Sequence, residues 1–491
     1  MRLRSLGLMM LAALLFAPAS AGAAGPAPGT PEYLQRDNQN IADAYGRQTG
    51  QQLGNPAYTQ AMLAEHNEVW VQQLAQQAAT PNRLALTPGN VFPGWNGGNP
   101  LRRGWTGRRG MRVPVSYTNR YGALIRGNVF APLPGARDPY NGRRLRKPYP
   151  GVVITTGSVQ GSERMYWWLA QDLAERGYVV LTYDVQGQGT SETLPHENEQ
   201  VNALPFCNPL APPGAGEDFG CPGVPAQQDS NFVYGTQDAL RFLLSTPRRA
   251  YPNRSGGDTP VNSFNPLWRL FDRSRDRRTA TPGRTRRVAI VGHSLGASAV
   301  SYVQGVDRRV ETVVALDKLN AGAGGFPGPQ RVTPVVPALA IQSEYGFNVQ
   351  PYWMQHGSSI QPRPGLPNEG PDPRREASTG FDAWRSAGVD SMLVVPRAST
   401  HLEYTDIAYV LPASRYGQAL TSAYVQRWLG RYLKHRRTRL LAPRLRYREP
   451  VDVGRWDEIQ LDRSERLSFY FCSGYSLGGR VSTDIAGVGG C

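Results

Sequence analysis

Cysteine and histidine are scarce in this chain of 491 residues, which has four of the former and six of the latter. Neither occurs at the spacing of a zinc site, since no Cys-x-x-Cys or His-Glu-x-x-His sequence is present. The nucleotide-binding pattern Gly-x-Gly-x-x-Gly is not completed after Gly187 and Gly189, because Glu192 stands in place of the third glycine. We therefore expect a protein without metal or organic cofactor.

Lysine is almost absent, so arginine carries nearly all the positive charge behind a formal net charge of +16. The only lysines are Lys147, Lys318 and Lys434. The arginines are scattered in short groups and form no recognisable nucleic-acid-binding motif, so we expect no nucleic-acid partner. The charge predicts instead a loose attraction to anionic cell surfaces or substrates that weakens as salt is added.

Long apolar runs are missing beyond the N-terminus, so no later segment is expected to cross a bilayer. At the N-terminus, Arg2 and Arg4 precede the apolar run 6–16, and small residues follow it between 19 and 24. This run is shorter than the roughly 20 residues that a membrane span needs. Residues 1–24 therefore predict a signal peptide, and we expect a secreted or periplasmic bacterial protein without stable membrane insertion.

The positions of the four cysteines fit such an oxidising compartment. Cys207 and Cys221 bracket a Pro/Gly-rich loop, and Cys472 and Cys491 bracket the end of the chain. Four cysteines allow three pairings, and we expect the two local disulfides, Cys207–Cys221 and Cys472–Cys491. Closing a loop of about 15 residues stabilises a fold by about 3 kcal/mol in the chain-entropy model.

Apolar runs of strand length alternate with helical patterns through the middle of the chain. The runs 111–117 and 123–131 flank a turn and predict an antiparallel hairpin. Further strands are expected at 151–156, 178–184, 288–291, 310–316, 335–343, 392–395 and 467–472, and helices at 166–174, 234–244, 418–434 and from Pro56 onward. This alternation predicts an α/β protein with a mostly parallel central sheet flanked by helices.

One strand of this series ends in a special turn. The β-branched run 288–291 is followed by Gly-His-Ser-Leu-Gly at 292–296, after which small residues continue at helical spacing. Such a strand, sharp turn and helix lift the serine hydroxyl above the sheet edge, and the two glycines leave no Cβ to block the approach. A second Gly-x-Ser-x-Gly, around Ser476, is followed by a polar, Gly-rich end with no helical pattern and no histidine.

The turn at 292–296 resembles the nucleophile elbow of the α/β-hydrolase family, in particular that of secreted bacterial serine esterases and lipases. The resemblance covers roughly residues 110–435 and implies an α/β-hydrolase fold with Ser294 as the nucleophile. Because the family order is serine, acid, histidine, it also implies His401 as the general base, just after the last expected core strand. His293 is then the variable residue of the turn.

The resemblance leaves two candidates for the acid. Most members have it after the penultimate core strand, where Glu344 follows the run 335–343. Some lipases have it one strand earlier, in a Leu-Asp context similar to that of Asp317, which follows the run 310–316. Both assignments stay open, with Glu403 as a more remote third.

The resemblance also implies two backbone amides that bind the oxyanion. One is the amide of Leu295, directly after the nucleophile. The other belongs to the loop after the strand 151–156, where Ser158 is the expected donor and Val159 the alternative. Family members usually have His-Gly in this loop, whereas this chain has Thr156-Gly157.

The expected organisation has four parts. These are a signal peptide (1–24), an N-terminal arm of helix and loop (25–109), a catalytic domain (110–440) and a C-terminal tail that forms an appendage closed by a disulfide (441–491). Two Pro-rich insertions in the catalytic domain, 192–231 and 346–380, are expected to lie over the site and shape the acyl pocket.

Together with the resemblance, these residues predict a secreted serine hydrolase that cleaves carboxylic esters through a Ser-His-acid triad and an acyl-enzyme. Its substrate is expected to be a small-molecule or lipid ester. The alternatives are an exported peptidase or amidase on the same fold, and a hydrolase-like protein that only binds its ligand. Nothing in the sequence indicates an oligomeric state.

Overall fold

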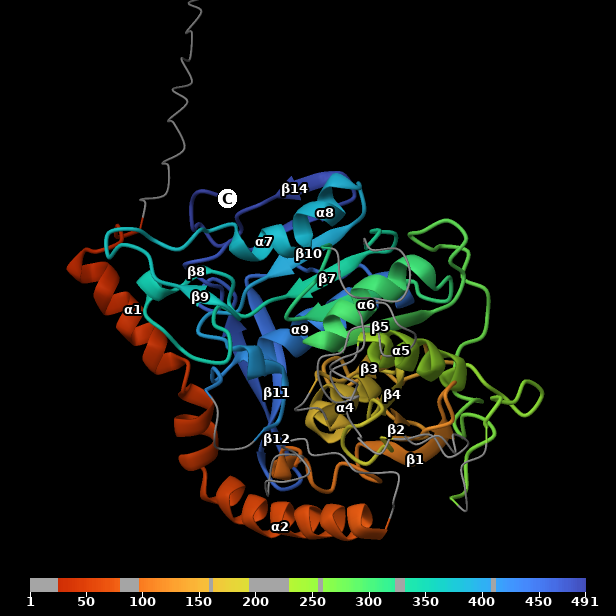
Figure 1. The fold of residues 1–491 in the computed structure, drawn as a ribbon. Coiled ribbons are helices and arrows are strands. Elements are labelled where there is room, and N and C mark those ends of the chain that lie inside the picture. The colour runs from red at the N-terminus through yellow and green to blue at the C-terminus, as the bar shows by residue number, and fades with distance from the viewer. Residues whose placement is uncertain are drawn as a thin grey trace, which may run out of the picture.

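The computed structural model describes residues 25–79, 97–158, 162–193, 229–254, 259–322, 332–407 and 412–491. In these residues ten strands form one central sheet in the order β1-β2-β4-β3-β5-β6-β7-β10-β13-β14 (Figure 1). Their bounds are β1 (Gly110–Thr118), β2 (Leu124–Pro132), β3 (Gly151–Thr155), β4 (Val179–Tyr183), β5 (Val288–His293), β6 (Thr312–Leu316), β7 (Ala338–Ile341), β10 (Ser391–Val394), β13 (Gly474–Leu477) and β14 (Arg480–Ser482). Two separate hairpins are β8 (His356–Gly357) with β9 (Pro362–Arg363), and β11 (Arg444–Asp452) with β12 (Arg455–Asp462).

The middle of the central sheet is parallel and its two sides are antiparallel. β4, β3, β5, β6, β7 and β10 pair in parallel. β1 and β2 add an antiparallel hairpin on one side, and β13 and β14 add another on the other side. The central strands are buried along their whole length, as expected for the nearly continuous apolar runs of a parallel sheet. The predicted mostly parallel α/β sheet and its opening hairpin are confirmed.

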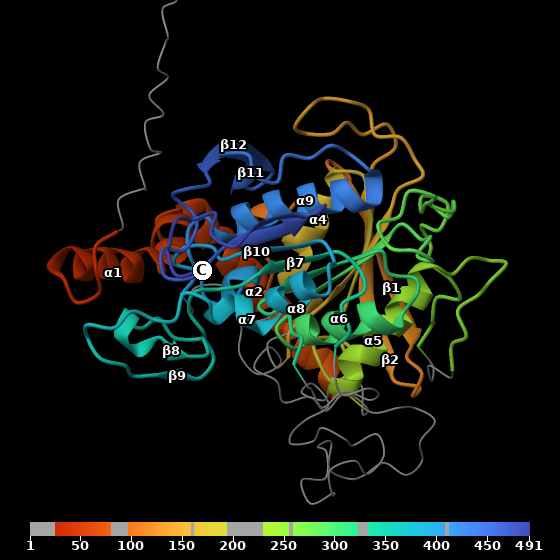
Figure 2. The same cartoon turned by 90° about the horizontal axis from the view of Figure 1, so that it is seen from above.

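Helices cover both faces of this sheet. α4 (Trp167–Glu175) and α9 (Gly417–Lys434) lie on one face, and α5 (Asp229–Leu243), α6 (Leu295–Val306), α7 (Arg375–Thr379) and α8 (Phe381–Ser386) lie on the other (Figure 2). Alternate residues of β3 belong to the two cores, since Val152 and Ile154 pack in the core of α4 and α9 and Val153 packs in the opposite one. Short 3₁₀ turns are η2 (Pro100–Arg102), η3 (Glu163–Tyr166), η6 (Tyr352–Met354) and η7 (His401–Tyr404).

The N-terminal arm consists of α1 (Pro31–Asp43), the π-helix η1 (Arg47–Leu53) and α2 (Pro56–Ala79), which run along the outside of the molecule in Figure 1. α2 begins at Pro56, where the sequence predicts a helix. α1 is not predicted from apolar spacing, because two of its three buried residues are the polar Asp37 and Asn40.

The C-terminal tail contributes β13 and β14 to the central sheet, so its description as an appendage is wrong. β13 pairs antiparallel with β10, and the second Gly-x-Ser-x-Gly is this strand, with Ser476 opposite Ser391. The strand expected at 467–472 is also wrong, because Leu467 makes only an isolated bridge to Pro396. Long-range pairing with β10, which no local pattern records, decides which part of the tail becomes a strand.

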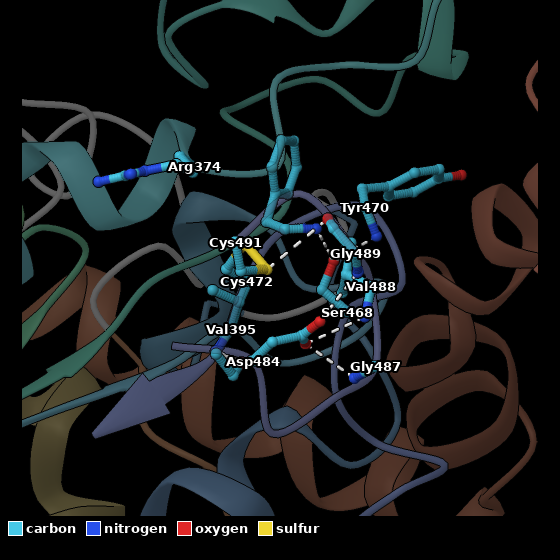
Figure 3. Close-up of a disulfide and its surroundings, with 12 residues drawn as sticks. Arg374, Val395, Ser468, Tyr470, Cys472, Asp484, Gly487, Val488, Gly489 and Cys491 are labelled. Atoms are coloured by element: carbon cyan, nitrogen blue, oxygen red, sulfur yellow. Dashed lines mark hydrogen bonds between the residues drawn. A yellow bond between two sulfur atoms is a disulfide. The ribbon is translucent and has the colours of Figure 1, made fainter. Parts of the chain in front are cut away.

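A disulfide joins Cys472 to Cys491, as predicted (Figure 3). Beside it, the carboxylate of Asp484 accepts hydrogen bonds from the amides of three residues of the last turn, Gly487, Val488 and Gly489. The predicted bond Cys207–Cys221, the signal peptide and most of the insertion 192–231 lie outside the described residues. Among the helices that the structure describes, none has both the length and the apolar content needed to cross a membrane.

Candidate active site

The turn after β5 holds Ser294 in a backbone conformation that few side-chain-bearing residues adopt, with φ 55° and ψ −123°. The flanking glycines make this turn possible. A Cβ at Gly292 would lie 2.1 Å from the carbonyl oxygen of Gly296, and a Cβ at Gly296 would lie 2.3 Å from that of Thr156. The serine amide donates to the carbonyl of Leu316 at the end of β6 (3.0 Å). The turn is therefore fixed against two neighbouring strands, and its serine side chain stays partly exposed.

Three of the predicted site residues form one hydrogen-bonded line at the carboxyl ends of the parallel strands. Ser294 Oγ lies 2.9 Å from His401 Nε2, and His401 Nδ1 lies 2.6 Å from Asp317 Oδ2. Ser294 follows β5, Asp317 follows β6, and His401 is the first residue of η7, which comes after β10. The histidine and the aspartate are each 1% exposed. The line can therefore move a proton from the serine to the imidazole while a buried carboxylate faces the imidazolium.

The surroundings of Asp317 keep its carboxyl group ionised. Burial alone would raise its pKa, but the hydrogen bond from His401, the charges of His401 and Lys318 and a hydrogen bond from Ser343 together hold the pKa below its ordinary value. The Ser343 hydroxyl donates to Oδ2 at 2.7 Å, and its amide donates to Oδ1 at 3.2 Å. A charged carboxylate in this place fixes which imidazole nitrogen carries the proton.

Glu344, the other predicted acid, lies elsewhere. Its Oε2 accepts hydrogen bonds from Asn40 Nδ2 (2.7 Å) and from the amide of Ala398 (2.6 Å). Burial raises the pKa of this carboxyl group. Within the described residues Glu344 has no hydrogen bond to His401. Its side chain contacts Asn40 of the N-terminal arm instead, and its amide donates to Ser399 Oγ. The structure thus brings Asp317, and not Glu344, to the imidazole.

Glu403, the remote third candidate, also serves the N-terminal arm. Its Oε1 accepts from Arg47 Nη2 at 2.8 Å, and both side chains are buried. The same guanidinium donates from Nη1 to the carbonyl of Thr405 (2.9 Å), and Glu403 Oε2 accepts from the amide of Ser414 (2.7 Å). Arg47 therefore attaches the arm to the segment that carries His401, and so does Asn40, whose Oδ1 accepts from Arg397 Nε (2.9 Å). A buried ion pair of this kind is costly to break, since one charge would be left without a partner.

The two candidate oxyanion amides border a cavity of about 770 Å³ in front of the serine, which is lined by Ser158, Ser294 and Leu295 among others. Leu295 is the first residue of α6, where a helix leaves its amides without intrahelical partners. The amide of Gly157 donates to Tyr166 Oη (2.9 Å), whereas those of Ser158 and Leu295 donate to no other described residue. Both amides therefore remain candidate donors to an oxyanion. The alternative donor, Val159, lies outside the described residues.

Sequence reasoning missed the part played by His293. Its ring is fully buried, with Nδ1 2.8 Å from Tyr166 Oη and Nε2 2.8 Å from the carbonyl oxygen of His401. Since a carbonyl only accepts, Nε2 carries the proton and Nδ1 accepts from the tyrosine hydroxyl. The resulting chain runs from the Gly157 amide through Tyr166 and His293 to the backbone of His401. It ties the loop before Ser158, the serine turn and the candidate base together.

The pKa of His293 predicts a pH-dependent stability. Burial and then the neighbouring His401 lower this pKa from 6.5 to about 3. Between these pH values the unfolded chain binds a proton that the folded chain does not bind, so the free energy of unfolding should fall as the pH is lowered from 6.5 toward 3. One such group contributes at most about 1.4 kcal/mol per pH unit.

Urea unfolding of the wild-type chain and of His293→Gln at pH 7, 6, 5 and 4 measures this contribution. The glutamine variant should be less stable at pH 7, because it cannot satisfy both Tyr166 and the His401 carbonyl in the same geometry. Its stability should also depend less steeply on pH than that of the wild type. Parallel curves for the two proteins would contradict the proposed neutral state of His293.

In the described part of the chain, no group of three or more His, Cys, Asp or Glu side chains is arranged to hold a metal ion. The serine, the histidine and the aspartate form a hydrogen-bonded line there. No protein-family model matches the chain, and a search of curated proteins likewise finds no match.

Proposed function

We propose that this chain is a secreted serine hydrolase of the α/β-hydrolase type that cleaves carboxylic esters through an acyl-enzyme. The observation that carries the proposal is the hydrogen-bonded line from Ser294 Oγ through His401 to Asp317 (2.9 and 2.6 Å). This line borders a cavity of about 770 Å³ that is also lined by Ser158 and Leu295, the residues of the two candidate oxyanion amides. A protein that only binds its ligand does not need a buried, ionised carboxylate bonded to the histidine, as Asp317 is here.

In the proposed reaction, Ser294 Oγ attacks the ester carbonyl carbon while His401 Nε2 takes the hydroxyl proton. The carbonyl oxygen becomes an oxyanion, which the amides of Leu295 and Ser158 stabilise; loss of one such donor costs on the order of 10²–10³ in rate. The carbon–oxygen bond to the alcohol then breaks, and the alcohol oxygen takes the proton from His401. Asp317 stays charged throughout and stabilises the imidazolium.

A water molecule completes the proposed cycle. His401 removes a proton from the water as its oxygen adds to the acyl carbon, and a second tetrahedral oxyanion forms in the same place. The bond to Ser294 Oγ then breaks, Oγ recovers a proton from His401, and the carboxylic acid leaves. Export of the enzyme is supported by the predicted signal peptide and by the Cys472–Cys491 disulfide, which fits an oxidising compartment.

Hydrolysis assays on the wild-type chain test this function. We expect turnover of short-chain p-nitrophenyl esters and no comparable cleavage of peptide p-nitroanilides. A fluorophosphonate probe should stop the turnover by phosphonylating Ser294 with loss of fluoride, so the peptide that contains Ser294 should gain the mass of the probe less that of HF. Absence of both ester turnover and adduct would reject the nucleophile. Cleavage of peptides without cleavage of esters would favour a peptidase or amidase on the same site.

A further inference from the structure

An aromatic side chain lies directly on the candidate base. The ring of Phe347 packs against the imidazole of His401, with centroids 4.7 Å apart and planes inclined by 59°. Phe347 is 40% exposed and Ile360 is 49% exposed, and both line the same cavity as Ser294. Two large, accessible apolar side chains therefore line the wall of this cavity, and one of them, Phe347, lies directly on the histidine.

The backbone holds this wall in place. The amide of His401 donates to the carbonyl of Gly346 (3.0 Å), and the amide of Tyr345 donates to the carbonyl of Ser399 (3.0 Å). A Cβ at Gly346 would lie 1.9 Å from the carbonyl oxygen of Ser359, so the two parts of the insertion touch at this point. The contact keeps the backbone of Ile360 close to Gly346, the residue before Phe347, and Phe347 in turn packs on the base.

The reaction itself determines which part of an ester meets this wall. His401 Nε2 must return its proton to the oxygen of the leaving alcohol, so that oxygen has to lie within hydrogen-bonding distance of Nε2. The group attached to the oxygen then continues past the imidazole. The acyl group, on the other side of the attacked carbon, is directed away from the base.

We propose that Phe347 and Ile360 form the subsite for the leaving alcohol, and that the enzyme prefers esters of bulky apolar alcohols, aromatic ones above all. This inference rests on the proposed ester hydrolase function. An aromatic ring on Phe347 gains both buried apolar area and a ring–ring contact, whereas a methyl group reaches neither side chain. The exposed position of the two residues lets the subsite take a group that extends toward solvent.

Esters that share one acyl group isolate the effect of the alcohol. Benzyl acetate and methyl acetate pass through the same acetyl-enzyme, so the ratio of their kcat/KM values reports only the steps up to its formation. The wild-type ratio should favour benzyl acetate. In Phe347→Ala and in Ile360→Ala the ratio should fall by about tenfold, the discrimination that a lost apolar contact gives.

Leu366→Ala is the matched control, because Leu366 is an apolar residue of the same insertion, 58% exposed, that is not among those lining the cavity. It should keep the wild-type ratio. An unchanged benzyl-to-methyl ratio in both cavity variants would overturn the proposal, and so would a change in acyl preference, measured with methyl acetate and methyl hexanoate. Failure of the ester function itself looks different, since the wild-type chain would then cleave none of these esters.

Discussion

Replacing Ser294 by alanine should lower the kcat for ester hydrolysis by a factor on the order of 10⁶, which is the loss found when a serine nucleophile is removed from an intact triad. The reason is that Oγ, 2.9 Å from His401 Nε2, forms the bond to the acyl group, and no other group on the turn can take its place. Alanine has no larger volume than serine, so the fold should be kept. Turnover of p-nitrophenyl acetate per mole of purified, folded protein measures the effect, and the alanine variant should form no fluorophosphonate adduct.

The chain provides its own control for this experiment. Ser476 lies in an equally matching Gly-x-Ser-x-Gly sequence, but it is a residue of strand β13, paired with Ser391 of β10. Ser476→Ala should therefore keep the wild-type turnover and lose no adduct. Equal turnover by Ser294→Ala and the wild type would show that Ser294 is not the nucleophile, whatever turnover Ser476→Ala has.

Local patterns in the sequence were sufficient for the turn that carries Ser294. The signals lie close together in the sequence: an apolar run, two glycines and the small residues after them. The observed β5 and α6 coincide with the strand and the helix that these signals predict. The parallel strands were predictable for the same reason, since each is an apolar run buried on both faces. The choice of His401 came from the family resemblance, which implies a histidine after the last of these runs.

The choice of the acid depended on contacts that a sequence does not show. Asp317 and Glu344 both follow a core strand, β6 and β7, and both are buried, so no local property separates them. The difference lies in the partners: the hydroxyl of Ser343 turns toward Asp317, whereas Asn40 from the N-terminal arm binds Glu344. A contact between positions 40 and 344 leaves no periodic signal.

The role of His293 was hidden for a related reason. It occupies the variable position of the turn, where the pattern Gly-x-Ser-x-Gly asks for no particular residue. Only the structure shows that Tyr166 and the carbonyl of His401 lie on either side of its ring. Buried polar residues with distant partners were likewise the reason why α1, with Asp37 and Asn40 inside, was missed.

Asparagine at position 317 should lower kcat by about 10⁴, the loss seen when a triad aspartate is made neutral without a change of shape. The neutral amide cannot stabilise the imidazolium. Its NH₂ group can also donate to His401 Nδ1, and the imidazole proton then sits on Nε2, which can no longer accept the proton of the serine. The bond from His401 Nδ1 to Asp317 Oδ2 (2.6 Å) is the contact removed. KM should change little, because no part of the substrate touches this buried carboxylate in the proposed reaction.

Glu344→Gln is the matched variant, since it makes the same chemical change in the other predicted acid. Its amide oxygen can still accept from Asn40 and from the amide of Ala398, and burial already raises the pKa of the carboxyl group it replaces. We therefore expect its kcat to stay within about tenfold of the wild type and its stability to change by about 1 kcal/mol, as measured by urea unfolding. If Glu344→Gln lowered kcat more than Asp317→Asn does, Glu344 would be the acid that acts on His401, and the line from Ser294 to Asp317 would not be the catalytic one.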